Sequence, residues 1–282
     1  MGAAGIIVEY NPLHSGHLRL LEAGRAALGP DTAMVCVMSG NFVQRGDFAL
    51  LRKHARARAA VESGADLVLE LPTVWAVSSA ETFARGAVGI LAAAGVVDVL
   101  SFGSECGAAD RLRQVAACLN SPVYESGVRR FVDEGMPFAA ARQEVVRGIL
   151  GPERSALLST PNNNLGVEYL RALPPGMEAL TIPRRGAAHD GPAAGGFASA
   201  SELRALLRAG RAAEADPYLT APWSGETASM AHIDRAVLAR LRMMDEADWA
   251  ALPDGGAAEG LPARLARSAR TADSLEDFYA RA

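Results

Sequence analysis

Two histidines lie close together near the N-terminus, His14 and His17, within residues 11–17 (NPLHSGH). An apolar run precedes this segment and a helical pattern follows it, so the histidines are expected at the start of a helix. A helix N-terminus offers unpaired N–H groups and partial positive charge to a polyphosphate. Two imidazoles there can donate hydrogen bonds to phosphate oxygens as charge builds up in a displacement. Such histidines also occur as caps or surface residues, but the buried run before this pair favours a nucleotide site.

The elements that must position these residues follow from the apolar runs. Continuous apolar sequences predict buried strands over residues 4–9, 33–38, 65–70 and 96–102. Helical patterns separate them over residues 17–28, 50–63 and 78–94. This alternation predicts a Rossmann-like α/β fold with a parallel sheet. Ligands of such sheets bind beyond the carboxyl ends of the strands, so the turns HSGH, SGNF and FGSE should meet at one crevice.

The second half of the chain is more helical. Patterns there predict helices within residues 110–150, 162–173 and 199–209, a short strand over 179–182 and a loop over 186–198. Strand patterns end after about residue 211, and short helical segments with Gly and Pro breaks follow. We therefore divide the chain into a nucleotide-binding α/β domain over residues 1–210 and a helical C-terminal region over residues 211–282.

Composition limits the classes of function. The net charge of −4 argues against a broadly basic nucleic-acid-binding protein, so RNA contact requires a local patch and no DNA partner is expected. The three cysteines form no CxxC pair, which argues against a disulfide framework or a structural zinc site and for a reducing cytosol. Neither a secretion signal nor a membrane-spanning run is present in the sequence, so we expect a cytoplasmic protein with no membrane partner.

Several longer blocks resemble one family. They are GIIVEYNPLHSGH, VMSGNFVQRGDFALLRKHARARAA, GADLVLELP, SAETFARGAV, FGSE, PNNNLGVEYLRAL, IPRRGAAHD and SASELR. In this order they resemble the bacterial tRNA(Met) cytidine acetate ligases of the HxGH nucleotidyltransferase superfamily, over most of residues 2–210. The resemblance implies that ATP and acetate form acetyl-adenylate, with Mg²⁺ bridging the phosphates. The acetyl group then passes to N4 of the wobble cytidine of elongator tRNA(Met).

The resemblance also implies roles for individual residues. The catalytic pair His14 and His17 would hold the phosphates and the departing pyrophosphate. The ATP-binding residues would be Ile7, Val8, Glu9, Tyr10, Asn11, Pro12, Leu13, His14, Ser15, Gly16, His17, Leu18, Arg19, Leu20, Gly103, Asn162, Asn163, Arg184, Arg185 and Ser199. Asn164 stands where the family usually has an apolar residue, which leaves open whether Asn162 or Asn163 faces ATP.

The acid substrate is expected at the end of the second strand. The residues assigned to it are Ser39, Gly40, Asn41, Gln44 and Arg45, although polar turns of this kind are common.

Ser199 has a second interpretation, as a simple N-cap. A set of basic residues falls mostly on one face of the helix predicted over 50–63, and it forms either a solvated face or a contact for phosphate or tRNA. This set is Arg52, Lys53, Arg56 and Arg58.

The C-terminal end departs from the family pattern. Family members are generally longer and carry a basic, tRNA-contacting segment, which is expected to begin where this sequence ends, after SLEDFYARA. We therefore expect ATP binding, whereas tRNA binding depends on that segment. Two alternatives remain open: an adenylyltransferase acting on a small phosphorylated coenzyme precursor, and a nucleotide-binding homologue without catalysis.

Overall fold

The computed structural model describes residues 2–44, 46–184, 198–221, 223, 225, 227–252 and 260–282. Arg45, Arg185 and His189 lie outside these residues, as does most of the loop expected over residues 186–198. The chain divides into two compact units, Met1–Thr227 and Ala228–Ala282. None of the helices in the part of the chain that the structure describes combines the length and the apolar character needed to cross a bilayer.

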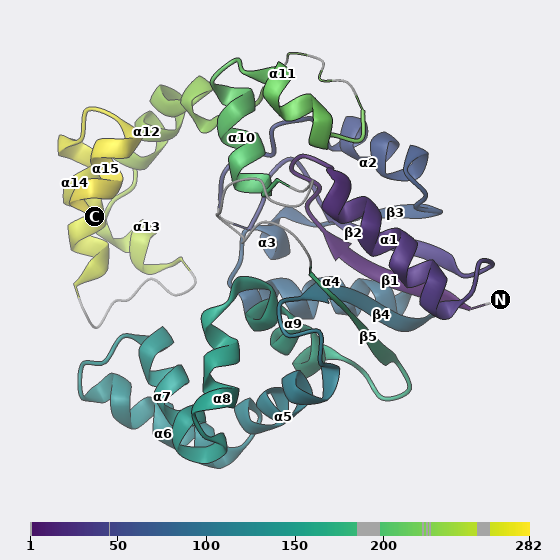
Figure 1. Cartoon of the computed structure of the whole chain (residues 1–282). Helices are drawn as coiled ribbons and strands as arrows, with labels where there is room; N and C mark the ends of the chain where they lie inside the picture. The colour runs from purple at the N-terminus through teal and green to yellow at the C-terminus, as the bar shows by residue number, and fades with distance from the viewer. Residues whose placement is uncertain are drawn as a thin grey trace. The chain divides into compact units, whose positions relative to one another are not determined.

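The first unit is built on one parallel sheet. Within the described residues its strands run in the order β3-β2-β1-β4-β5 (Figure 1). They are β1 (Ala3–Val8), β2 (Ala33–Ser39), β3 (Leu67–Leu71), β4 (Val97–Ser104) and β5 (Glu178–Pro183). β1 and β2 are buried almost throughout, as their continuous apolar sequences require. The Rossmann-like α/β fold expected from the sequence is confirmed.

The strand order reverses direction at β1. The chain passes from β1 outward to β2 and β3, then returns to the other side of β1 for β4 and β5. In open parallel sheets a ligand binds beyond the carboxyl ends of the strands at this point of reversal. The residues that follow β1 and β4 are therefore placed where a ligand is expected.

Two helices cover the first face of the sheet. They are α1 (Ser15–Leu28) and α2 (Lys53–Glu62). Leu21 of α1 and Ala60 of α2 are buried against alternate residues of β1 and β2, among them Ile6 and Cys36. α2 begins later than the predicted residue 50, because the preceding loop is held elsewhere: the N–H of Leu50 donates to Asn11 Oδ1 at 2.8 Å.

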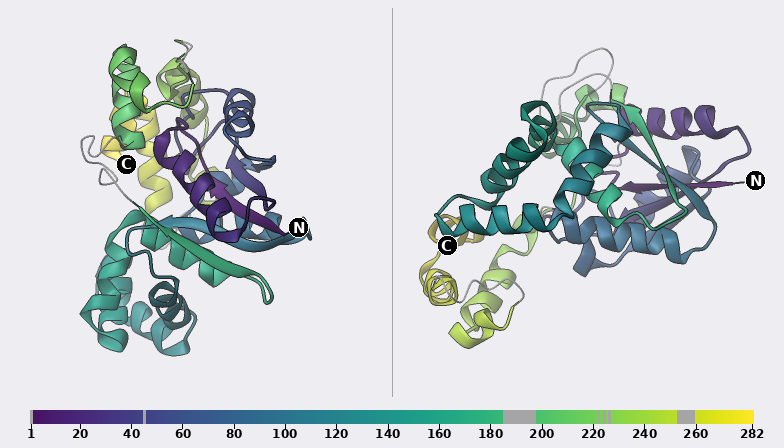
Figure 2. Two further views of the ribbon diagram at one scale, coloured as in Figure 1. Left: turned by 45° about the vertical axis from the view of Figure 1, so that its right-hand side comes forward. Right: turned by 90° about the horizontal axis from the view of Figure 1, so that it is seen from below.

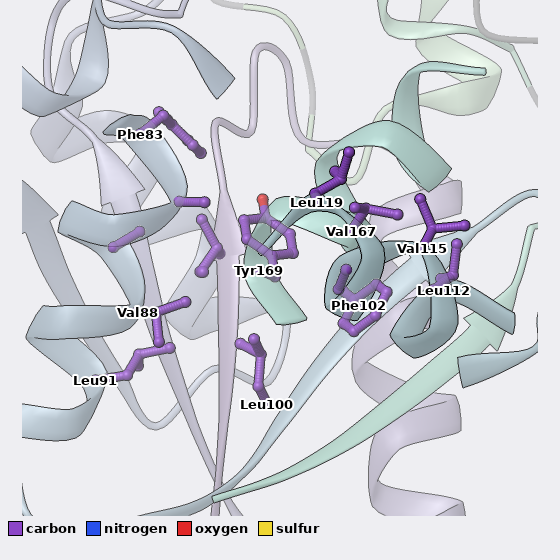
Figure 3. Close-up of a cluster of buried hydrophobic side chains, with 14 of the residues drawn as sticks. Phe83, Val88, Leu91, Leu100, Phe102, Leu112, Val115, Leu119, Val167 and Tyr169 are labelled. Carbon is purple, nitrogen blue, oxygen red and sulfur yellow. The ribbon is translucent and has the colours of Figure 1, made fainter. Parts of the chain in front are cut away.

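The other face carries the larger core. Its helices are α3 (Thr73–Ala76), α4 (Ala80–Ala93), α5 (Ala109–Leu119) and α9 (Pro161–Ala172) (Figure 2). Figure 3 shows side chains from α4, β4, α5 and α9 meeting in this core, with Phe102 and Tyr169 at its centre. Their rings meet edge to face, with centroids 5.7 Å apart. This packing fixes α9, whose first turn lies beside the end of β4.

Further helices complete the first unit. Between α5 and α9 the chain forms α6 (Pro122–Asp133), α7 (Phe138–Leu150), α8 (Pro152–Ser155) and η1 (Ala156–Ser159). After β5 it forms α10 (Ala200–Arg208), α11 (Ala212–Ala215) and η2 (Asp216–Tyr218). Leu203, Leu207 and Ala215 are buried around Leu50, and Trp223 packs against them. These contacts join residues beyond 210 to Leu50, and the first compact unit extends to Thr227.

The second unit is helical in its described residues. It consists of η3 (Met230–His232), α12 (Asp234–Arg242), α13 (Glu246–Ala250), α14 (Leu261–Thr271) and α15 (Leu275–Arg281). A small core of its own contains Leu238, Trp249, Ala269 and Phe278. The rings of Trp249 and Phe278 stack with centroids 6.1 Å apart.

Candidate functional site

The two histidines begin helix α1 and cap it reciprocally. His14 is the N-cap, and its Nδ1 accepts a hydrogen bond from the N–H of Gly16 at 3.1 Å. The N–H of His14 in turn donates to Nδ1 of His17 at 3.4 Å. Since each neutral imidazole uses Nδ1 as an acceptor, its proton must be on Nε2. The capping contacts therefore leave both rings with an Nε2–H donor for a ligand.

Close packing holds the two rings in place. Their centroids lie 3.9 Å apart, and the ring of Tyr10 meets His17 edge-on at 5.1 Å. A Cβ on Gly16 would lie 2.9 Å from Cε1 of His14, so only glycine fits beside this ring. Tyr10 has a φ of 48°, a left-handed conformation that is uncommon for a residue with a side chain. Burial of its ring and a 3.6 Å contact between its hydroxyl and Cys36 Sγ hold the turn in that conformation.

Both histidines are neutral at physiological pH. Burial first, and then the positive charges of Arg184 and Arg204, lower the pKa of His14 to about 4. The pKa of His17 lies well below its ordinary value, because of burial first and then the nearby His14 and Arg184. The rings are therefore neutral, and the arginines place positive charge beside them.

These pKa shifts predict how stability depends on pH. An unfolded histidine titrates near 6.5 and the folded His14 near 4, so between these values the unfolded chain binds the additional proton. The free energy of unfolding should therefore fall as pH drops from about 6.5 to about 4, by on the order of 3 kcal/mol from His14. Above pH 6.5 this contribution is complete, and below pH 4 it is lost.

Urea unfolding of the wild type and of His14→Asn at pH 7 and pH 4.5 measures this contribution. Asparagine retains an oxygen that can accept the Gly16 N–H and cannot titrate, so the variant should lose less stability on acidification than the wild type. Carboxylates that titrate over the same range are common to both proteins and cancel in the comparison. Equal losses in the two proteins would contradict the assignment of a buried, neutral His14.

The first turn of α10 lies beside the histidine turn. Ser199 is buried, and its Oγ accepts the N–H of Glu202 at 3.1 Å, so the capping interpretation of Ser199 is confirmed. Arg204 donates to the main-chain oxygen of Asn11 at 3.0 Å and to Ser201 Oγ at 2.9 Å. We did not select Arg204 from the sequence, although it ends the SASELR block. The structure places its charge close enough to His14 to lower the pKa of that ring.

A second group of residues lies at the carboxyl ends of β4 and β5. Arg184 extends over Gly103, where an added Cβ would touch its Cγ at 3.4 Å. Nη1 of Arg184 donates to Asn162 Oδ1 at 3.4 Å. Glu105 was not selected from the sequence, yet its carboxylate accepts the main-chain N–H groups of Asn162 and Asn163 at the start of α9, at 3.1 and 2.6 Å. Burial alone would raise the pKa of Glu105, but the hydrogen bonds to its carboxylate have the larger combined effect and lower the pKa below its ordinary value.

The two candidate asparagines differ in their surroundings. The amide of Asn163 is buried, accepts the N–H of Cys106 at 3.1 Å and donates to Thr160 Oγ1 at 2.6 Å. Both of its polar atoms are thus used to hold the loop after β4 against α9. Asn162 also uses both polar atoms, since its Nδ2 donates to Glu105 Oε1 at 2.7 Å and its Oδ1 accepts from Arg184 at 3.4 Å. It is nevertheless partly exposed, so it is the better candidate to face a ligand.

The turn after β2 carries the residues predicted for the acid. Ser39 is fully buried and its hydroxyl has no hydrogen-bond partner among the described residues. Asn41 Oδ1 accepts the N–H of Lys53 at 3.0 Å, and the N–H of Gln44 donates to Glu9 Oε1 at 2.9 Å. Gly40 lies against Glu70, whose Oε1 would be 2.4 Å from an added Cβ. The turn after β2 is therefore tied directly to the residue that follows β1.

The remaining predicted residues of the segment from Ile7 to Leu20 have mainly packing roles. Hydrophobic side chains from this segment lie in the sheet core or against it: Ile7, Val8, Tyr10, Leu13 and Leu20. Asn11 is also buried and holds Leu50. Pro12 is buried, and Ser15, Leu18 and Arg19 are partly buried. The hydroxyl of Ser15 is buried without a partner among the described residues, so it remains a candidate for contact with a ligand.

The basic residues of α2 do not form one exposed face. Arg56 is 1% exposed and points into the protein, so the interpretation of the whole set as a solvated or tRNA-contacting face is wrong for this residue. Lys53 forms an ion pair with Glu70 at 2.6 Å. Arg52 and Arg58 are exposed. Arg56 is buried because it lies on the same face of α2 as the buried Ala60, whereas the sequence interpretation placed it with the exposed basic residues.

Comparisons with known proteins agree with this geometry. The sequence model of the HIGH Nucleotidyl Transferase family matches residues 1–282. The chain is 45% identical over 205 residues to the tRNA(Met) cytidine acetate ligase of Alkaliphilus metalliredigens, covering 67% of this chain and 48% of that protein. It is also 45% identical over 214 residues to the enzyme of the same name from Caldanaerobacter subterraneus, covering 73% and 53% of the two chains. This chain thus spans about half the length of the curated relatives it matches.

Solved structures extend the likeness to the fold. The apo crystal structure of Thermotoga maritima TmcAL superposes with a TM-score of 0.88 at 32% identity and covers 100% of this chain and 71% of that one. The structure of the same protein bound with alpha-thio ATP gives a TM-score of 0.85 at 32% identity, covering 99% and 69%. The chain belongs to the HIGH Nucleotidyl Transferase family, in which these relatives are tRNA(Met) cytidine acetate ligases.

Proposed function

We propose that this protein is an ATP-dependent ligase that activates acetate as acetyl-adenylate and acetylates N4 of the wobble cytidine of elongator tRNA(Met). The observation that carries the proposal is the pair of neutral Nε2–H donors at the start of α1, with Arg184 and Arg204 close to them. Relatives with this name and the TmcAL structure bound with alpha-thio ATP support it.

The first step is a displacement at phosphorus. A carboxylate oxygen of acetate bonds to the α-phosphorus of ATP, the bond to the bridging oxygen breaks, and pyrophosphate leaves with the electron pair. His14 and His17 donate to phosphate oxygens as negative charge moves onto the leaving group. Arg184, Arg204 and the N-terminus of α1 reduce the repulsion between the two anionic reactants. Asn162 and Ser15 complete the proposed ATP contacts.

The second step is acyl transfer to an amine. The N4 nitrogen attacks the acetyl carbon, AMP leaves, and the nitrogen loses one proton. The acid would lie at the turn after β2, beside Ser39, Gly40 and Gln44, which Glu9 joins to the nucleotide turn. The tRNA substrate belongs to the proposal through the names of the relatives.

Magnesium is proposed to enter bound to the phosphates of ATP. Across the described residues, no group of three or more His, Cys, Asp or Glu side chains is placed to hold a metal ion. Mg²⁺ would neutralise phosphate charge as part of the bound nucleotide, and the steps above use only groups of the chain.

Acetate-dependent exchange of labelled pyrophosphate into ATP tests the first step with the 282-residue chain alone. We expect exchange with acetate and none without it, and a second reaction with elongator tRNA(Met) should yield acetylated cytidine and AMP. Pyrophosphate exchange that is independent of acetate but requires a phosphorylated coenzyme precursor would show that the protein is an adenylyltransferase instead. ATP binding without any exchange would show a homologue that has lost catalysis.

A further inference from the structure

Arg56 of α2 is a charged side chain buried beneath the site. Its guanidinium donates to four main-chain oxygens: those of Glu9 and Gly40, that of Ser39 at 3.0 Å and that of Leu51 at 3.1 Å. Glu9 directly follows β1, and Ser39 and Gly40 end and follow β2. One side chain thus binds the carboxyl ends of two neighbouring strands.

The chemistry of these contacts fits arginine alone. The four acceptors approach from three segments of chain, and a planar guanidinium presents five N–H donors in fixed directions. A lysine ammonium has three donors and could not reach all of them. Burial lowers the pKa of Arg56 to about 10, while the carboxylates of Glu9 and Glu70 act in the opposite direction. The side chain therefore stays protonated at neutral pH.

Other contacts make the two turns one connected structure. Gln44 from the second turn donates to Glu9 Oε1 at 2.9 Å, and Lys53 joins Glu70, which packs on Gly40. We call residues 9–17 the nucleotide turn and residues 39–44 the acid turn. Arg56 adds a link of another kind, because its side chain binds the main chain of both turns.

We propose that Arg56 is a positioning residue that sets the separation of the nucleotide turn and the acid turn, and so aligns the carboxylate of the acid with the α-phosphate. Attack requires the reacting atoms to approach to about 3–3.5 Å, and a displacement of about 1 Å can cost on the order of 100-fold in rate. The identity of the reactants rests on the proposed function, whereas the coupling of the two turns does not.

Amide hydrogen exchange tests the coupling without any catalysis. Arg56→Lys keeps the charge with fewer donors, and Arg56→Met removes both. We expect faster exchange in the nucleotide turn and the acid turn of both variants, with β4 and β5 unchanged. Arg25→Met is the matched control, because Arg25 also binds a main-chain oxygen, that of Gly64 at 2.8 Å, and pairs with Asp66 outside the two turns.

The kinetics of acetate-dependent pyrophosphate exchange test whether Arg56 aligns the carboxylate with the α-phosphate. Arg56→Lys should lower kcat by roughly 10- to 100-fold while the Kd of ATP changes much less, since each half of the site persists but their separation is lost. For Arg56→Ala, millimolar guanidinium added to the buffer should restore part of kcat. Arg25→Met should retain the kcat of the wild type.

The outcomes separate this inference from the proposed function. In the Arg56 variants, faster amide hydrogen exchange throughout the first unit would overturn the positioning role. Unchanged amide hydrogen exchange in both turns would also overturn it. A loss of ATP affinity as large as the loss of kcat would also overturn the positioning role, because it would show that Arg56 supports the fold in general. If the wild type shows no acetate-dependent exchange, the proposed function fails while the hydrogen-exchange measurement still decides the coupling.

Discussion

Replacing His17 by alanine is expected to lower the rate of acetyl-adenylate formation by about 100- to 1,000-fold while weakening ATP binding far less. The reason is that Nε2–H of His17 is a neutral donor held in place by Tyr10 and His14. In the proposed reaction it donates to a phosphate oxygen whose negative charge grows as pyrophosphate leaves. Removing an interaction that strengthens in the transition state lowers kcat and kcat/KM together. Single-turnover measurements with ATP and acetate, together with calorimetric ATP binding, check this result.

Two further substitutions separate donation from capping. In His17→Asn the side-chain oxygen can replace Nδ1 as acceptor for the His14 N–H, so the helix cap remains but the donor is lost. In His17→Gln the amide nitrogen can lie near the position of Nε2, so part of the activity should return. Equal losses of turnover and ATP affinity in His17→Asn would show that His17 merely holds the ground state.

Replacing Glu168 by glutamine is expected to destabilise the first unit by about 3–5 kcal/mol. The carboxylate is 1% exposed and is paired with Arg142 and with Arg171, the latter at 2.7 Å. Neutralising it removes the carboxylate paired with Arg142 and leaves Arg171 with the more exposed Glu81 at 3.4 Å. Arg142 belongs to α7, and Glu168 and Arg171 belong to α9, so the substitution removes an ion pair that joins these two helices.

Urea unfolding followed by tryptophan fluorescence measures this effect. Trp249 is the tryptophan of the second unit, so a Trp249→Phe background restricts the signal to Trp75 and Trp223 of the first. Glu81→Gln is the matched control: Glu81 also pairs with Arg171, at 3.4 Å, but its side chain is 50% exposed. Its effect should stay within about 1 kcal/mol. Similar effects of the two substitutions would contradict the role assigned to burial.

The parts of this protein that follow from the sequence are those with a repeating pattern or a dense motif. Apolar runs located β1, β2 and β4 because strands buried on both faces need uninterrupted apolar side chains. The histidine segment was recognisable because its residues adjoin one another. Their capping contacts are local in sequence, so spacing alone predicts a helix start.

The residues that sequence reasoning missed act over long separations. Arg56 looks like its exposed neighbours until the carbonyls of Glu9 and Gly40 are placed around it. Glu105 precedes Asn162 by 57 residues, and only the docking of α9 beside β4 shows that its carboxylate caps that helix. The same docking distinguishes the buried Asn163 from Asn162. The local sequence pattern does not predict contacts between residues so far apart in the chain.

The contact between Arg204 and Asn11 has a consequence for synthesis on the ribosome. The two residues are 193 positions apart, yet the arginine binds the main chain of the nucleotide turn. A nascent chain that has released its first strands carries both histidines but lacks this cation. Growing chains therefore lack part of the proposed phosphate site until α10 has left the exit tunnel, so binding of ATP by unfinished protein is disfavoured.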